Sequence, residues 1–298
     1  IYPVFAFALI FMALALMVCL FVKWPSLPEL WDGRGNLGES KGLLNGQPIF
    51  PCLFITIACG AVSGFHATQS PMMARCLTDE RLGRPVFYGA MITEGIVALI
   101  WATVSSWFFF DGGAAEVGAT VSAAAPDVVV KVSKGWLGVL GGILAILGVV
   151  AAPITSGDTA FRSARLIVAD FLHLNQKPVA NRLMISIPLF LIAGVLLWYN
   201  IADENGFNVI WRYFGWANQT LAVFMLWTST AYLVKFKKGL TYLITMIPAA
   251  FMTAVCTTYI CVAKIGLGLP GSWNRAIGLA TFIVSLVVFY ILYFRRRK

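Results

Sequence analysis

Long apolar runs separated by short polar segments make up most of this chain of 298 residues. A helix that crosses the hydrocarbon core of a membrane needs about 20 mostly apolar residues. Eight runs are close to this length or longer. We therefore predict eight membrane-spanning helices, over residues 2–22, 48–69, 86–110, 136–154, 183–199, 208–234, 240–263 and 277–294.

The second run ends in a cluster of polar and helix-breaking residues. Residues 63–71 contain a glycine, a proline, two serines, a threonine, a glutamine and one of the two histidines of the chain. Inside a membrane, backbone N–H and C=O groups can lack hydrogen bonds within their own helix only where other protein groups or a water-filled cavity satisfy them. The cluster therefore predicts a broken helix that presents polar groups to a molecule or ion passing through the membrane protein.

The segments between the runs differ in character. Residues 23–47 are mixed in charge and predict a structured external loop, whereas residues 111–135 show no helical pattern. Thr155 and Asp158 have the spacing of a helix-capping pair, and Asp158 precedes Arg162 by four residues. We expect a new helix to begin there and residues 158–174 to lie along the membrane surface as an amphipathic helix.

Composition supports a membrane protein and gives an orientation. The chain is 59% hydrophobic and 12% charged, with a mean hydropathy of +0.82, whereas soluble domains carry about 25% charged residues. The net charge of +9 does not indicate nucleic-acid binding, because the basic residues lie in short loops. Residues 73–85, 157–183, 235–238 and the C-terminus hold fourteen of the 22 basic residues. The positive-inside rule then predicts that both ends of the chain are cytoplasmic.

The six cysteines form no CxxC pair, and most lie within apolar runs. We interpret them as small core residues and predict no metal site and no cofactor. The chain begins at Ile1, already inside an apolar run. We therefore expect it to be the C-terminal part of a larger membrane protein.

Two long motifs carry a resemblance to a known family. Residues 63–71 read SGFHATQSP and residues 75–81 read RCLTDER. Together they resemble the signature of the carbon starvation protein A family. Residues 152–165, APITSGDTAFRSAR, resemble the second characteristic segment of that family. The resemblance covers essentially the whole chain, and both motifs occur in order.

The resemblance implies a function. Members of the family are inner-membrane transporters, induced in carbon starvation, that take up peptides and, in close relatives, pyruvate by proton symport. They are similar to the amino acid–polyamine–organocation superfamily, which uses discontinuous helices. The implied partners are therefore a peptide or pyruvate, protons and the bilayer, in a bacterial inner membrane. Family members carry further spans before the part that Ile1 resembles, so we expect residues 1–298 to be one transmembrane domain without those spans.

The broken helix supplies the first candidate residues. His66 could relay a proton or bind a carboxylate, because histidine changes charge near neutral pH. Its alternative role is a neutral hydrogen-bonding group that holds the break in shape. The neighbouring polar groups could contact substrate, or could only end the helix and bond to other helices; they are Ser63, Gly64, Thr68, Gln69 and Ser70.

Other candidates lie elsewhere in the chain. Glu94 lies within the third span, where a carboxylate could take up and release a proton or could pair with a basic group. The expected helix start at Thr155, Ser156 and Gly157 would offer free amides to an anion, with Asp158 as a cap or a proton carrier. Asn218 and Gln219 lie mid-span and could line the pathway or bond between helices.

A membrane-embedded nutrient or starvation sensor is the alternative function. It is the weaker interpretation, because no cytoplasmic segment between the predicted spans exceeds about 27 residues. An enzyme is not expected, since the chain has no HExxH, no GxSxG and no carboxylate pair on one span. The sequence leaves three questions open: peptide or pyruvate as substrate, the coupling ion and the oligomeric state.

Overall fold

The computed structural model describes residues 2–25, 49–57, 62–120, 125–203, 206–237 and 239–293, and these contain helices and no strands. Almost all of the external loop expected over residues 23–47 lies outside the described residues. The helices form two compact units. An all-α fold is therefore confirmed.

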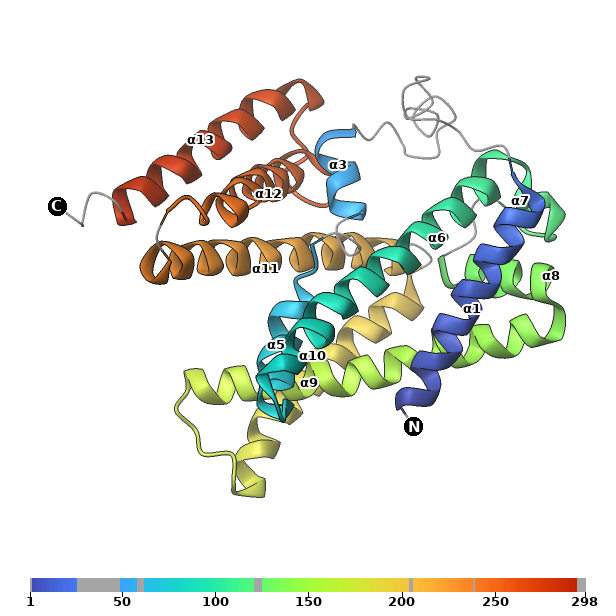
Figure 1. The fold of residues 1–298 in the computed structure, drawn as a ribbon, viewed down its shortest axis with the longest axis horizontal. Helices are drawn as coiled ribbons and strands as arrows, with labels where there is room; N and C mark the ends of the chain where they lie inside the picture. Colours follow the sequence, from blue (N-terminus) through green and yellow to red (C-terminus); the bar gives the residue numbers. More distant parts are fainter. Residues whose placement is uncertain are drawn as a thin grey trace. The chain divides into compact units, whose positions relative to one another are not determined.

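The first unit is built around α1 (Tyr2–Lys23), which lies beside α6 (Ala90–Phe110) and α8 (Ala125–Ala145) (Figure 1). A 3-10 turn, η3 (Glu80–Leu82), and a π-helix, η4 (Arg84–Gly89), lead into α6, and α7 (Gly113–Glu116) follows it. The π-helix η5 (Ile146–Val150) connects α8 to α9 (Ala151–Phe171). The core of the unit consists of fully buried apolar side chains from α1, α6 and α8: Met12, Leu16, Val104, Phe108 and Val132.

The second unit is built around α12 (Leu243–Val262), which packs between α11 (Gly206–Phe236) and α13 (Asn274–Tyr293) (Figure 1). The unit also contains α5 (Phe65–Cys76), α10 (Val179–Ala202) and η6 (Gly271–Trp273). The short helix α3 (Ile49–Thr56) lies against both α11 and α12. The Asn274 side-chain amide donates a hydrogen bond to the Phe50 carbonyl at 3.1 Å and so ties the start of α3 to α13.

Six helical segments in the described part of the chain are long and apolar enough to cross a membrane: Pro3–Lys23, Glu80–Phe110, Ala125–Val149, Val179–Ala202, Leu243–Val262 and Gly271–Tyr293. They confirm a polytopic membrane protein, but the predicted number of eight is not established. The run over residues 48–69 contains the separate helices α3 and α5, each too short to span. The helix α11 has 31 residues, but its polar residues make it less hydropathic than these six segments, so it is not counted among them.

The surface of α10 also fits a membrane. Phe190, Leu191, Trp198 and Ile201 all lie exposed on this helix. Water-soluble proteins rarely expose apolar patches of this extent. A lipid environment or further protein would remove the cost of exposing them to water.

The predicted helix start at Thr155 to Asp158 is wrong. The helix α9 begins at Ala151, directly after η5, so residues 155–158 lie inside it. Proline has no N–H and clashes with the carbonyl four residues earlier, and a wide π turn can accommodate such a defect. Because η5 ends three residues before Pro153, we attribute the continuity of the helix to this π turn. The surface position of residues 158–174 stays a prediction.

Residues 111–135 also differ from the prediction, because α7 and the first part of α8 lie within them. The α8 backbone breaks at Gly138, with φ 62° and ψ −145°. A Cβ on Gly141 would lie 1.9 Å from the Ser133 carbonyl oxygen, so the two arms of α8 meet closely at this break. The expected start of the fourth span at Trp136 lies near the break, whereas its expected end at Ile154 lies inside α9.

Candidate site at a broken helix

The predicted break in the second apolar run is present. The helix α3 ends at Thr56 and α5 begins at Phe65, with residues 62–64 in non-helical conformation. Residues 58–61 lie outside the described part. One predicted span therefore contains the C-terminal end of one short helix and the N-terminal end of another. Such ends carry partial negative and positive charge, respectively.

The start of α5 packs directly on the backbone of α11. A Cβ added to Gly64 would lie 2.0 Å from the Asn218 carbonyl oxygen and 2.7 Å from the Leu221 Cβ. Only glycine allows this approach. The Phe65 N–H donates a hydrogen bond to the Asn218 Oδ1 at 3.0 Å, so Asn218 caps α5 from another helix. The Phe65 ring also packs on Phe214, with centroids 5.1 Å apart.

Gln219 is the least satisfied polar residue at this contact. Its side chain is 1% exposed, and neither its Oε1 nor its Nε2 has a hydrogen-bond partner in the described part of the chain. Gly215, one turn earlier on α11, approaches Ile55 of α3, and Val223, one turn later, packs on the α12 core. Gln219 therefore lies on the side of α11 that faces the broken span. A buried polar group without partners costs about 1–3 kcal/mol.

A hydrogen bond fixes α11 next to α12. The Trp216 indole N–H donates to the Cys256 carbonyl oxygen at 3.0 Å, one turn from Gln219. The position of the Asn218–Gln219 pair is therefore set by α12 as well as by α3 and α5. The site is therefore bounded by the packed helices α11 and α12 on one side and by the break between α3 and α5 on the other.

The remaining residues of the cluster lie on or beside the first turns of α5. Ser63 is buried, whereas His66, Gln69 and Ser70 are half-buried. The Thr68 hydroxyl donates to the Phe65 carbonyl at 2.9 Å, a hydrogen bond within α5. The structure thus brings Gly64 and Phe65 to Asn218, the residue next to Gln219 on α11.

The sequence did not predict this pairing. Its two signals were a glycine within the cluster and a polar pair in mid-span. Neither signal says which helix meets which.

The other candidates belong to the first unit. Glu94 is half-buried on α6, near the middle of the Glu80–Phe110 segment. The Asp158 carboxylate forms an ion pair with the Arg162 guanidinium at 3.3 Å, one turn apart on the exposed side of α9. Ser156 is exposed and Gly157 is half-buried on the same helix. Since these residues lie within α9, the free amides expected at Thr155 are not available to an anion.

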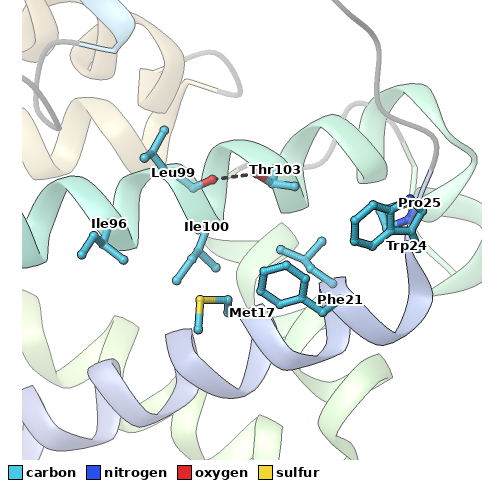
Figure 2. Close-up of a pocket in the computed structure, with 9 residues that line it drawn as sticks. Met17, Phe21, Trp24, Pro25, Ile96, Leu99, Ile100 and Thr103 are labelled. Atoms are coloured by element: carbon cyan, nitrogen blue, oxygen red, sulfur yellow. Dashed lines mark hydrogen bonds between the residues drawn. The ribbon is translucent and has the colours of Figure 1, made fainter.

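An apolar pocket of about 360 Å³ lies between α1 and α6 (Figure 2). Met17 and Phe21 face Ile96 and Ile100 across it, and Trp24 and Pro25 lie at one end. The Thr103 hydroxyl, one of the few polar groups of the lining, already donates to the Leu99 carbonyl at 2.9 Å. The lining therefore contains no charged side chain that could hold a carboxylate or an ion.

Metal ligands do not gather in the described residues, which contain no group of three or more His, Cys, Asp or Glu side chains placed to hold an ion. The five described cysteines are free thiols: Cys19, Cys52, Cys76, Cys256 and Cys261.

Comparison with known proteins identifies relatives over most of the chain. The family model described as carbon starvation protein CstA matches residues 4–139 and 109–259. An uncharacterized protein of Haemophilus influenzae is 46% identical over 129 residues, which are 43% of this chain and 88% of that protein. No solved structure matches the chain.

Two named relatives are transporters of Escherichia coli. The peptide transporter CstA is 29% identical over 296 residues, which cover 78% of this chain and 41% of the relative. The pyruvate/proton symporter BtsT is 27% identical over 323 residues, which cover 80% of this chain and 43% of the relative. The chain thus spans less than half the length of either transporter.

Proposed function

Because the chain belongs to the carbon starvation protein CstA family, we propose that it provides the broken-helix site of a secondary active transporter. The substrates are peptides or small carboxylates such as pyruvate, as the names of the relatives suggest. The chain is a multi-pass membrane protein. We place it in the bacterial inner membrane with both ends cytoplasmic, which agrees with the distribution of its basic residues.

The observation that carries this proposal is the contact between the broken span and Asn218, beside the unsatisfied amide of Gln219. A helix N-terminus favours anions, and α5 begins at this contact. The buried Gln219 amide has no partner among the described residues, and its Nε2–H groups can donate to a carboxylate. Both candidate substrates carry a carboxylate. Substrate binding would therefore satisfy a polar group that folding leaves unsatisfied.

Proton coupling is assigned to two side chains. His66 follows the capped Phe65 on the first turn of α5, so its charge would act next to a bound carboxylate. Glu94 is a carboxylate in the middle of a membrane-length helix, where such groups commonly serve as proton carriers. Asp158, the third predicted proton carrier, is a weaker candidate than His66 and Glu94, because its carboxylate already forms an ion pair with Arg162.

Uptake measurements test the function. Labelled peptide and labelled pyruvate are offered to vesicles that contain the protein, with and without an inward-directed proton gradient. We expect the gradient to drive uptake of at least one of them, and we expect His66→Ala and Glu94→Gln to abolish the gradient dependence. If folded protein takes up neither substrate, the transporter proposal is contradicted and the sensor alternative is favoured.

A single substitution separates a binding role of Gln219 from a structural one. Gln219→Met keeps the approximate size of the side chain but removes the amide. Because the amide is buried without partners, its removal should leave the unfolding temperature unchanged or raise it, while uptake falls by tenfold or more. Thr228→Val, on the same helix, serves as the control, since the exposed Thr228 hydroxyl donates to the Phe224 carbonyl on its own helix. Lower stability with normal uptake in Gln219→Met would show that Gln219 is a structural residue.

A further inference from the structure

A lysine of the first unit lies in a site built like a receptor for an ammonium group. The Lys23 Nζ lies 5.9 Å from the centroid of the Trp107 ring and 5.4 Å from that of the Trp136 ring. It also forms an ion pair with the Glu116 carboxylate. The four residues come from α1, α6, α7 and α8, so the helices of this unit converge on one cation. We call these four residues the ammonium cage.

Local packing holds the walls of the cage in place. The two tryptophan rings contact each other, with centroids 4.5 Å apart, and Trp107 is buried. Gly113 lies so close to Trp107 that a Cβ there would be 2.6 Å from the ring, which brings α7 and Glu116 near the ring. The walls are therefore set by the packing of α6, α7 and α8, whereas Lys23 enters from the last residue of α1.

Two aromatic faces and a carboxylate are the groups that proteins use to bind an ammonium ligand. The present occupant is held weakly. The Lys23 and Glu116 side chains are 38% and 49% exposed, and ion pairs at such exposed positions contribute little. A long, flexible lysine side chain can leave such a site without unfolding the helix that carries it.

We propose that the ammonium cage binds the primary ammonium group of a small ligand, such as the amino terminus of a peptide, and that Lys23 occupies the cage as an internal competitor. The predicted orientation places the end of α1 at the outer face, where an incoming ligand arrives. The choice of a peptide rests on the proposed transport function, but binding to the cage does not. A carboxylate without an ammonium group, such as pyruvate, is not a ligand for this site.

Calorimetric titration of the purified protein with alanyl-alaninamide tests the proposal. This probe carries an ammonium group but no carboxylate, so it does not report on the broken-helix site. Lys23→Met removes the competitor and should raise the affinity about tenfold. Lys131→Met, which removes an exposed lysine on α8, should leave the affinity at the wild-type value. Acetylation of the amino group should abolish binding to every variant.

A second substitution tests the carboxylate of the cage. In the Lys23→Met background, Glu116→Gln should lower the affinity at least tenfold, because the ion pair with the probe is lost. If Lys23→Met does not fold, Lys23→Gln serves instead. An unchanged affinity on removal of Lys23, or equal binding of the acetylated probe, would overturn the proposal. Loss of uptake with intact probe binding would contradict only the transport function, and intact uptake without probe binding would contradict only the cage.

Discussion

At the scale of single residues, the contact between Gly64 and the backbone of α11 leaves no room for a side chain. Gly64→Ala would place a Cβ 2.0 Å from the Asn218 carbonyl oxygen, so α5 must move away from α11. We expect a loss of about 1–3 kcal/mol in stability, measured by denaturant unfolding, together with reduced uptake. The matched control is Gly194→Ala on α10, where a new Cβ meets nothing within 4 Å. Equal stability of the two variants would contradict the packing described here.

The Asn218 side chain gives a second prediction at this scale. Asn218→Ala removes the acceptor of the Phe65 N–H, and a lost helix cap costs about 0.5–2 kcal/mol. Asn218→Asp keeps an acceptor oxygen and should retain more of the stability. Thermal unfolding of both variants measures the difference. If Asn218→Ala and Asn218→Asp lost the same stability, the hydrogen bond from Phe65 would not be what matters at this position.

The sequence predicts the importance of a residue when local composition reveals it, but not when it depends on a contact with a distant part of the chain. His66, Gln69 and Asn218 could be selected because polar groups inside apolar runs are costly. The role of Gly64 could not be predicted, because it depends on the backbone of a helix about 150 residues later in the chain. The ammonium cage was not predicted either. Lys23 and Glu116 fall in two different segments between the predicted spans, 93 residues apart, and only folding makes them a pair.

At the scale of helices, the break in α8 depends on one glycine. The Gly138 backbone, with φ 62° and ψ −145°, occupies a region that only glycine adopts readily. Gly138→Ala should therefore cost about 1–3 kcal/mol in the free energy of unfolding. Gly142→Ala, in the second arm of the same helix, should be neutral or slightly stabilising, because a Cβ there meets nothing within 4 Å. A neutral Gly138→Ala would show that the break can form without this conformation.

The helices show what hydrophobic periodicity can and cannot predict. The apolar runs gave the existence of α1, α6, α10, α12 and α13, because membrane-length apolar stretches have few other folded forms. Continuity was harder to predict. Thr155 and Asp158 form a good capping signal, yet the π turn before Pro153 carries the helix onward to Phe171. A capping pair has the same residue types and spacing whether it lies inside a continuous helix or at a helix start. The sequence alone therefore could not decide whether a helix begins at Thr155.

At the scale of the whole molecule, the basic loops make the orientation testable. Cys76 is exposed at the end of α5, in the first of the basic segments predicted to be cytoplasmic. The test uses a variant in which Cys76 is the one remaining cysteine. A membrane-impermeant maleimide should label it in inverted vesicles but not in intact cells. The reason is that short loops rich in Lys and Arg are retained on the cytoplasmic side.

The opposite face provides the control for this orientation. Ala115 is exposed on α7, in the segment over residues 111–135 that the same topology places outside. With every native cysteine replaced, Ala115→Cys should react with the maleimide in intact cells. Cys76 and Ala115→Cys bracket the Glu80–Phe110 segment, so labelling from opposite sides requires that this segment crosses the membrane once. Labelling of both from the same side would contradict that crossing, and labelling with the sides exchanged would contradict a cytoplasmic location for the basic loops.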